Sequence, residues 1–469
     1  MTIDTPGMRA LADAEPKVFW LDRSDLPEPS PPPPSGRVDA DLCVVGGGYT
    51  GLWAAIQAKE LDPDRDVVVL EGDRVAHGAS GRNGGFLDAS VTHGLANGLE
   101  HFPGEIERLL AIGRDNYRGI LTALDAYRID AAFEATGELV VATDAYQVPG
   151  LAESAALRAR YGEDAVLLDR DEVRAEVDSP RLLGGVWQRS HIGLVDPVAL
   201  ALGLRRAADA LGVRIFENAR ATRVSGAGSA VRIDTATGHV EAAGVILATN
   251  AFRGLVAPIR RAVATVYDYV LVTEPLSEAQ RASIGWKKRQ GLADSANQFH
   301  YFRLTADDRI LWGGYDAVYY YGGRVSQRRD QRPRTMSLLA EQFFDLFPQL
   351  EGVRFTHQWG GPIATTSRFC ASFGTALEGR LAYSVGYTGL GVAASRFGAR
   401  VALTLLDDPS ADVARLDFVR SRPFPFPPEP LRWLGITLTR RAIARADRRE
   451  GRRGAWLSLL DRLGLGFDS

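Results

Sequence analysis

The chain has 469 residues, of which 45% are hydrophobic and 24% charged, and its formal net charge is −3. This composition is typical of a globular protein with two or three packed units, and the charge excludes a surface that attracts nucleic acid or anionic membranes as a whole. The two cysteines, Cys43 and Cys370, are too few for a disulfide framework and have no histidine at ligand spacing, so we expect a reducing compartment and no metal site.

The N-terminal residues 1–36 contain no basic region followed by an apolar core. We therefore expect neither a secretory signal nor a transmembrane segment, and the sequence predicts a cytoplasmic protein. The proline-rich residues 27–34 predict an extended arm. The apolar Val18, Phe19 and Trp20 are expected to bury against the body and hold this arm in place.

Residues 39–71 predict a strand, a glycine turn, a helix and a second strand that ends on an acid. In such a unit the glycines let the backbone approach a pyrophosphate, the helix N-terminus stabilises its charge, and the acid accepts a ribose hydroxyl. The stretch therefore predicts a dinucleotide site, and a plain glycine turn in an ordinary α/β domain is the alternative. The residues expected at this site are Gly46, Gly48, Tyr49, Thr50, Gly51 and Glu71.

A second glycine-rich loop, residues 78–85, follows the second strand directly. A nicotinamide-binding domain would continue there into another helix and strand. The small residues of this loop, together with Ser80, Arg82 and Asn83, can wrap a phosphate and the ring system beyond it. This departure from the pattern of a nicotinamide-binding domain indicates that the dinucleotide is FAD.

The central part of the chain mixes helical and strand patterns. A continuous apolar run, residues 244–249, predicts a buried central strand, and Ala248 and Thr249 at its carboxyl end lie where ligands gather in open α/β sheets. The other predicted elements are helices at 106–127 and 198–211 and strands at 137–142, 183–187, 212–216 and 221–224.

From residue 267 to residue 321 the sequence becomes strand-rich and aromatic, which predicts an antiparallel sheet that can form a wall of a substrate pocket. Arg303 can hold a carboxylate or phosphonate there, or pair with Asp307 or Asp308 at the surface. Aromatic side chains in such a sheet are often core residues, but they can also form a box that attracts an amine. The candidates for this box are Tyr269, Tyr301, Trp312 and Tyr315.

Near the C-terminus a second strand, glycine turn and helix is predicted, with the strand at 381–385 and the turn at 386–391. The N-terminus of this helix can direct amides at a flavin edge and stabilise negative charge on a reduced ring. The tail beyond residue 421 contains a proline-rich stretch and an arginine-rich predicted helix at 439–454. We interpret this helix as a solvated face or as ion pairing with the acidic body, and we expect no nucleic-acid partner.

Together these motifs resemble the FAD-dependent oxidoreductases of the D-amino acid oxidase, glycine oxidase and sarcosine oxidase superfamily, and most of all gamma-glutamylputrescine oxidase-like proteins and aminophosphonate oxidoreductases. The resemblance covers most of residues 38–406 and includes Leu-Val-Asp-Pro at 194–197 and Leu-Ala-Thr at 247–249. It implies an α/β fold, α+β overall, with a Rossmann-like FAD-binding domain assembled from discontinuous segments and an antiparallel-sheet substrate domain. The expected division is an N-terminal arm at 1–36, an FAD-binding domain at 37–88, 178–252 and 356–410, a substrate domain at 89–177 and 253–355, and a C-terminal helical tail at 411–469.

The resemblance also implies which residues meet the FAD. The first glycine turn would face the pyrophosphate, and Glu71 the adenosine ribose. Relatives with covalent flavin use a cysteine or a histidine where this chain has residues 359–362 and Arg82, so FAD is expected to be noncovalent. The remaining implied contacts are Ser80, Arg82, Asn83, Gly84, Gly85, Val224, Gly361, Gly386, Gly389, Leu390 and Gly391.

The superfamily oxidises a C–N bond by passing hydride from the carbon beside nitrogen to flavin N5, after which the imine hydrolyses. The resemblance therefore implies an FAD-dependent amine or amino-acid oxidase or dehydrogenase. The lysine that assists oxygen in monomeric sarcosine oxidases has no counterpart in residues 310–315, so the electron acceptor is oxygen or another molecule. An NAD(P)H-linked flavin monooxygenase or reductase and a non-catalytic flavin-binding scaffold stay open, and the sequence carries no signal for the oligomeric state.

Overall fold

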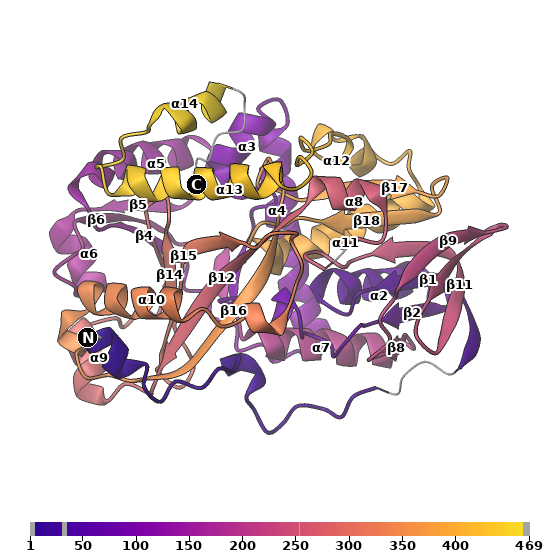
Figure 1. Cartoon of the computed structure of the whole chain (residues 1–469), viewed down its shortest axis with the longest axis horizontal. Helices are drawn as coiled ribbons and strands as arrows, with labels where there is room; N and C mark the ends of the chain where they lie inside the picture. The colour runs from indigo at the N-terminus through magenta and orange to yellow at the C-terminus, as the bar shows by residue number, and fades with distance from the viewer. Residues whose placement is uncertain (1–4, 31–34, 253, 463–469) are drawn as a thin grey trace.

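A computed structural model describes residues 5–30, 35–252 and 254–462, without the side chains of Tyr315 and Asp461. Two large sheets lie beside each other, the first on the right and the second on the left of Figure 1, and helices cover their outer faces. No helix in this described part of the chain combines the length and the apolar character needed to cross a bilayer.

The first sheet has a parallel centre in which β1 pairs with β11 on one side and with β2 on the other. All four residues of β2 are buried, because helices pack on one face of the sheet and antiparallel strands and loops cover the other. The strands are β1 (Gly36–Val45), β2 (Val67–Leu70), β8 (Arg214–Phe216), β9 (Arg223–Ala227), β10 (Ala230–Asp234), β11 (Gly238–Leu247), β17 (Ser372–Ala376) and β18 (Leu381–Val385).

A helical layer made of segments far apart in sequence covers this sheet. α2 packs between α7 and α11, and α4 packs against α11 on the outside. α7 starts where it does because Asp196 accepts hydrogen bonds from two backbone amides of its first turn, each at 2.9 Å, and Pro197 occupies the first helical position. The helices of the layer are α2 (Tyr49–Leu61), α3 (Leu95–His101), α4 (Ile106–Ala126), α7 (Pro197–Ala210) and α11 (Gly391–Asp407).

The second sheet is antiparallel except for the pairing of β13 with β4, and α10 covers one of its faces. β6 and β16 belong to it, although they lie in segments that the sequence division assigns to the FAD-binding domain. The strands are β4 (Glu138–Ala142), β5 (Ala165–Leu168), β6 (Gly184–Gln188), β12 (Ala264–Thr273), β13 (Gly291–Asp294), β14 (His300–Leu304), β15 (Ile310–Tyr319) and β16 (Phe355–Thr365).

One short sheet and several further helices and turns complete the fold. A two-stranded sheet pairs β3 with β7 between them. The remaining elements are β3 (Phe86–Asp88), β7 (Ile192–Leu194), α1 (Pro6–Ala10), α5 (Val148–Arg160), α6 (Arg170–Glu176), α8 (Ala257–Ala262), α9 (Glu278–Ile284), α10 (Pro333–Leu346), α12 (Asp417–Arg420), α13 (Leu431–Asp447), α14 (Ala455–Arg462) and the 3-10 turns Phe19–Leu21, Ala79–Gly81, Ala145–Gln147, Gln327–Arg329, Pro348–Leu350 and Asp412–Arg415.

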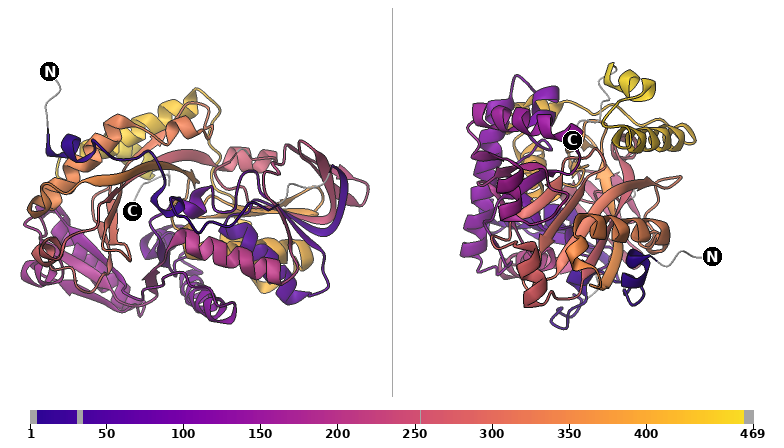
Figure 2. Two further views of the ribbon diagram at one scale, coloured as in Figure 1. Left: turned by 90° about the horizontal axis from the view of Figure 1, so that it is seen from below. Right: turned by 90° about the vertical axis from the view of Figure 1, so that its left-hand side faces the viewer.

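The N-terminal arm crosses the molecule from α10 to β1 (Figure 2). Trp20 is only 6% exposed and packs against Val270, Trp359 and α7, while Val18 and Phe19 are half-buried beside it. The expectation that this apolar cluster fastens the arm is confirmed. Within the proline-rich part of the arm, residues 31–34 lie outside the described residues.

The arginine-rich helix of the tail differs from its predicted bounds of 439–454. α13 runs over Leu431–Asp447, because the Glu429 carboxylate accepts a hydrogen bond from Trp433 N at 3.1 Å and so satisfies a free amide of the first turn. The helix ends before Gly451, whose φ of +73° is outside the helical region and whose N–H returns to Ala446 O at 3.0 Å.

Candidate cofactor and substrate site

The first glycine turn leaves no room for a side chain at Gly46 or Gly51. Gly46 has a φ of +114°, and a Cβ placed on Gly51 would lie 1.8 Å from Gly46 O. At the end of β2, the Glu71 carboxylate accepts hydrogen bonds from Gly47 N at 2.6 Å and from Asp73 N at 2.9 Å, and burial raises its pKa. The acid thus lies directly against the turn, as the sequence pattern predicts.

The second glycine-rich loop lies over the N-terminus of α2, because Ser80 Oγ accepts a hydrogen bond from Tyr49 N at 3.0 Å. Asn83 fixes the shape of the loop, since its Nδ2 donates to the carbonyls of Ala79 and Ser80, both at 3.0 Å, and its Oδ1 accepts from Gly85 N at 2.8 Å. Trp20 Nε1 in turn donates to Asn83 O at 3.0 Å. The N-terminal arm therefore supports this loop directly.

Arg82, which belongs to the same loop, points toward the second sheet. Its Nη1 donates to Asp330 at 2.8 Å and to Gly360 O at 3.0 Å. A Cβ on the neighbouring Gly361 would lie 3.5 Å from Arg82 Cβ, so the loop and β16 are in contact. Arg82 therefore joins the two halves of the molecule with its guanidinium already engaged.

At the carboxyl end of β11, Ala248 N donates to Val45 O at 2.9 Å and so places the next residue beside the first glycine turn. The Thr249 hydroxyl that follows is buried, and none of the described residues offers it a hydrogen-bond partner. A buried hydroxyl without a partner costs about 1–3 kcal/mol, so its presence at the ligand-binding end of the sheet indicates a bound group.

The third turn, residues 386–391, contains Gly386 with a φ of +84° and Gly389 with a φ of +95°. Leu390 and Gly391 begin α11, whose first turn has no side-chain cap and so presents free amides. Thr50 Oγ1 of α2 donates to the Tyr387 hydroxyl at 3.0 Å, which places this turn against the first glycine unit. Three turns that are far apart in sequence therefore form one cradle.

Val224 lies further along the first sheet. It pairs with Ile233 in the β9–β10 hairpin and packs beside the cluster that contains Leu70 and Leu247. Its backbone thus belongs to the antiparallel hairpin beside β11.

The three predicted box residues whose side chains are described do not come together. Tyr269 and Trp312 lie on the face of the second sheet that α10 covers, where Trp312 Nε1 donates to Leu339 O at 3.0 Å and the Tyr269 hydroxyl lies 2.7 Å from that of Tyr320. Tyr301 pairs with Gly313 and therefore lies on the opposite face. The side chain of Tyr315 is outside the described residues. Tyr269 and Trp312 are core residues.

Arg303 does not form the surface ion pair with Asp307 or Asp308 that was one interpretation of its position. It is 2% exposed, and it donates to Val195 O at 2.7 Å and to Leu304 O at 3.1 Å. Asp307 and Asp308 pair with other arginines. Burial lowers the pKa of Arg303 to about 10. Its guanidinium therefore stabilises the junction between the halves.

Asp268 is the residue that the sequence analysis missed. It lies on the same face as Tyr301, whose hydroxyl donates to its carboxylate at 2.8 Å, and both side chains are half-buried. Burial raises the pKa of Asp268 to about 6, and the Tyr301 hydrogen bond opposes this rise. A Cβ on Gly84 would lie 2.8 Å from the Tyr301 ring, so the pair faces the second glycine loop. An acid inside an apolar strand was the signal available in the sequence.

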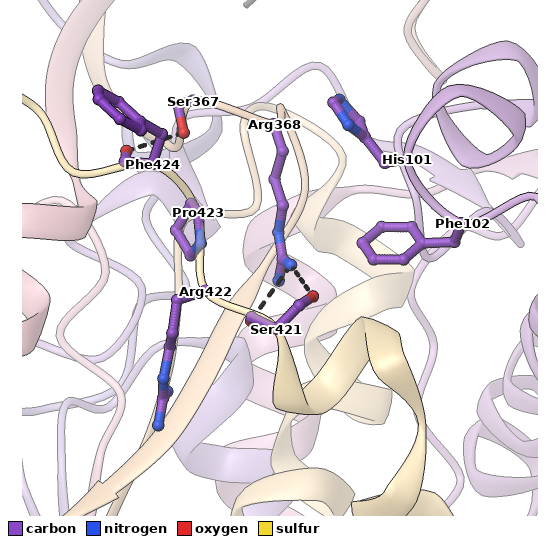
Figure 3. A pocket seen from close by; sticks show the side chains of 8 residues that line it. All are labelled: His101, Phe102, Ser367, Arg368, Ser421, Arg422, Pro423 and Phe424. Atoms are coloured by element: carbon purple, nitrogen blue, oxygen red, sulfur yellow. Dashed lines mark hydrogen bonds between the residues drawn. The ribbon is translucent and has the colours of Figure 1, made fainter. Parts of the chain in front are cut away.

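A separate cavity of about 210 Å³ lies where the tail leaves the body (Figure 3). Arg368 crosses its wall and donates to Ser421 Oγ at 2.6 Å and to Phe418 O at 3.2 Å. Because these donors are engaged by protein acceptors, the arginine fastens the tail to the turn before β17. Among the described residues, no group of three potential metal ligands lies together.

A cradle of glycine turns at the carboxyl ends of parallel strands, with an acid at the second strand and a second sheet across from it, defines a flavin-dependent oxidoreductase. The comparison with family models gives the same class, since the FAD dependent oxidoreductase model, DAO, matches residues 41–404. The chain belongs to this DAO family.

Three known proteins illustrate the relationship. Gamma-glutamylputrescine oxidoreductase of Escherichia coli (strain K12) is 34% identical over 83% of this chain and 88% of its own length. Sarcosine oxidase subunit beta of Rhizobium meliloti (strain 1021) is 26% identical over 73% of this chain and 76% of its own. Glycine oxidase from Bacillus cereus ATCC 14579 superposes with a TM-score of 0.67 at 17% identity, covering 82% of this chain and 99% of that structure, which shows a shared fold.

Proposed function

We propose that FAD is bound noncovalently across the three turns of the cradle. The Thr249 hydroxyl, which has no hydrogen-bond partner among the described residues, supports a tightly bound group, as do the glycines that exclude a Cβ. Cys43 and Cys370 are both buried in apolar clusters, which supports a noncovalent link. The residues that would hold the FAD are Gly46, Gly48, Tyr49, Thr50, Gly51, Glu71, Ser80, Asn83, Gly84, Gly85, Val224, Ala248, Thr249, Gly361, Gly386, Gly389, Leu390 and Gly391, with Arg82 shaping the loop.

We further propose that the enzyme oxidises the C–N bond of a small amine. The observation that carries this proposal is the Asp268–Tyr301 pair, a carboxylate hydrogen-bonded to a tyrosine whose ring lies against the second glycine loop. An ammonium group suits such a carboxylate. Arg82 and Arg303, two arginines at the second glycine loop, both donate to protein acceptors, so a substrate carboxylate finds no free guanidinium from either. An amine is therefore favoured over an α-amino acid.

The bound flavin supplies a hydride acceptor. Asp268 would hold the substrate nitrogen and accept a proton from it, because hydride leaves most readily from beside a neutral amine. The Tyr301 hydroxyl would keep the carboxylate in one orientation. Val270, Leu311 and Trp359, which are buried on the same face, would keep water away from the reacting carbon, and the imine would hydrolyse after release.

Anaerobic titration of the purified yellow protein tests this proposal. A panel of polyamines, N-methyl amino acids, D-amino acids and aminophosphonates is added without oxygen, and bleaching by a member of the amine group is expected. Bleaching by NADPH alone would favour a monooxygenase or reductase, and bound flavin that no amine reduces would favour a scaffold. Readmitting air identifies oxygen or another molecule as the electron acceptor.

We also propose a cytoplasmic, reducing location, which the two free buried cysteines support.

The variant Thr249→Val is expected to change FAD affinity and apoprotein stability in opposite directions. Losing a hydrogen bond to FAD should weaken binding about fivefold to tenfold, whereas removing a buried hydroxyl without a partner should stabilise the apoprotein by about 1 kcal/mol. Fluorescence titration with FAD and urea unfolding of the apoprotein measure the two effects. Thr136→Val is the matched control, because the Thr136 hydroxyl is also buried without a described partner but lies outside the cradle. It should stabilise the protein and leave FAD affinity unchanged.

The variant Trp20→Phe is expected to loosen the second glycine loop. It keeps an aromatic ring but loses the donor to Asn83 O, so FAD should dissociate about fivefold faster if the loop hydrogen bond contributes about 1 kcal/mol. The rate of FAD release is measured by stopped-flow mixing of the enzyme with an excess of an apoflavoprotein, which traps the released FAD. Trp456→Phe removes a comparable indole hydrogen bond, to Thr439 at 3.0 Å in the tail, and should not change FAD release. Equal effects of both variants would contradict the support that the arm gives to the loop.

A further inference from the structure

The tail carries a charge and an exposed surface unlike those of the rest of the chain. Residues 431–462 contain nine arginines and three carboxylates, in a protein whose net charge is −3. The same segment exposes large apolar side chains, namely Leu431, Trp433, Leu434, Leu438, Trp456 and Leu459. Exposed apolar residues gathered beside a cationic surplus mark an interaction surface.

The inner side of α13 is fastened to the body. Arg440 pairs with Asp316, and the Asp447 carboxylate accepts hydrogen bonds from Gln298 N at 3.1 Å and from Asn297 Nδ2 at 2.6 Å. Thr439 and Ala446 are buried on this side. The helix is therefore held in a fixed orientation, and its opposite side is exposed; in Figure 1 α13 lies in the upper half of the molecule with α14 above it.

The residues on that opposite side follow helical spacing. Leu431, Leu434 and Leu438 occupy the first turns, and Leu431 is 60% exposed. Three exposed arginines continue the same stripe over the later turns, and no carboxylate in the described chain pairs with them; they are Arg441, Arg445 and Arg448. We call this stripe of six residues the outer face of α13.

We propose that the outer face of α13 docks on the surface of an anionic lipid bilayer. Leucine inserts at the boundary between headgroups and acyl chains, while arginine keeps its charge among the anionic headgroups. The charge of the stripe is complementary to such a surface and repels an identical stripe, which disfavours a second copy of this chain as the occupant. Leucines in its first half do not match a nucleic-acid backbone.

Flotation of the FAD-loaded full-length enzyme with vesicles tests the proposal. Vesicles of 70% phosphatidylcholine and 30% phosphatidylglycerol are compared with pure phosphatidylcholine, at ~0.1 M and ~1 M salt. Binding is expected only to the anionic vesicles and only at low salt. Because each arginine near such a surface contributes about fivefold to the partition coefficient, Arg441→Gln, Arg445→Gln and Arg448→Gln combined should reduce binding on the order of 100-fold.

The matched control removes the same charge elsewhere. Arg170, Arg206 and Arg400 are exposed on α6, α7 and α11, and their combined replacement by Gln should leave vesicle binding within about twofold of the unmodified enzyme. Leu434→Ser with Leu438→Ser should also abolish binding, because the apolar part of the stripe is lost. Flavin content verifies that each variant is folded.

Three results would overturn the proposal. The enzyme stays out of the anionic vesicle fraction, or the outer-face and control variants bind equally well, or analytical ultracentrifugation reveals a dimer that the leucine variant alone dissociates. The last result would assign the outer face to a second copy of the chain. None of these outcomes bears on amine oxidation, which the bleaching experiment measures separately.

Discussion

Gly51→Ala is expected to yield protein without flavin. The added methyl carbon would lie 1.8 Å from Gly46 O; it is bonded directly to the Cα and the oxygen belongs to the backbone, so neither atom can swing aside. The turn must open, which separates the N-terminus of α2 from the position of the pyrophosphate. We expect the flavin content to fall at least about tenfold and the free energy of unfolding to fall by about 3 kcal/mol, the upper range for overpacking.

Flavin absorbance after gel filtration and urea unfolding measure these two effects. Gly150→Ala is the matched control, because a Cβ on Gly150 in α5 has no neighbour within 4 Å. That variant should keep its flavin and gain up to about 1 kcal/mol from the helix propensity of alanine. Gly47→Ala should be intermediate, since its Cβ would lie 3.0 Å from the Glu71 side chain. A fully yellow Gly51→Ala protein would contradict the tight turn.

The first sheet and its glycine turns were predictable because each depends on local pattern. β18 has the predicted bounds, and α4 ends one residue before its predicted end. The contact between Glu71 and the first turn also follows from local spacing, because one strand, one helix and one strand fix the distance. The DAO family match confirms the fold class and the cofactor that these motifs imply.

The substrate wall was less predictable because the face on which a strand residue lies depends on its register with its neighbours. Tyr269 and Tyr301 are both tyrosines in aromatic strands, yet pairing places one beneath α10 and the other toward the cofactor half. Composition alone cannot distinguish these positions. The hydrogen bonds of Arg303 could not be predicted from sequence pattern either, because its acceptor, Val195 O, lies far away in sequence.

Asp268→Asn is expected to remove most of the activity toward an amine and to leave the flavin bound. Losing a half-buried carboxylate opposite an ammonium costs about 3 kcal/mol, on the order of 100-fold in kcat/KM. The pH profile gives the sharper test. Because burial raises the pKa of Asp268 to about 6, the carboxyl is neutral below that pH, and kcat/KM should rise as the pH increases through about 6. This acidic limb should be absent from the Asn variant.

Tyr301→Phe distinguishes the proposed role of Asp268 from a general effect on the fold. The Tyr301 hydroxyl lowers the pKa of Asp268 by stabilising the charged carboxylate, so the Phe variant should keep the acidic limb but shift it to higher pH. Asp88→Asn is the matched control, because Asp88 is also a half-buried carboxyl whose pKa burial raises to about 6, and it lies in β3, where it accepts a hydrogen bond from Ser90 N at 2.9 Å. It should leave the limb near its original pH. If the limb survives in Asp268→Asn at an unchanged pH, another group binds the amine.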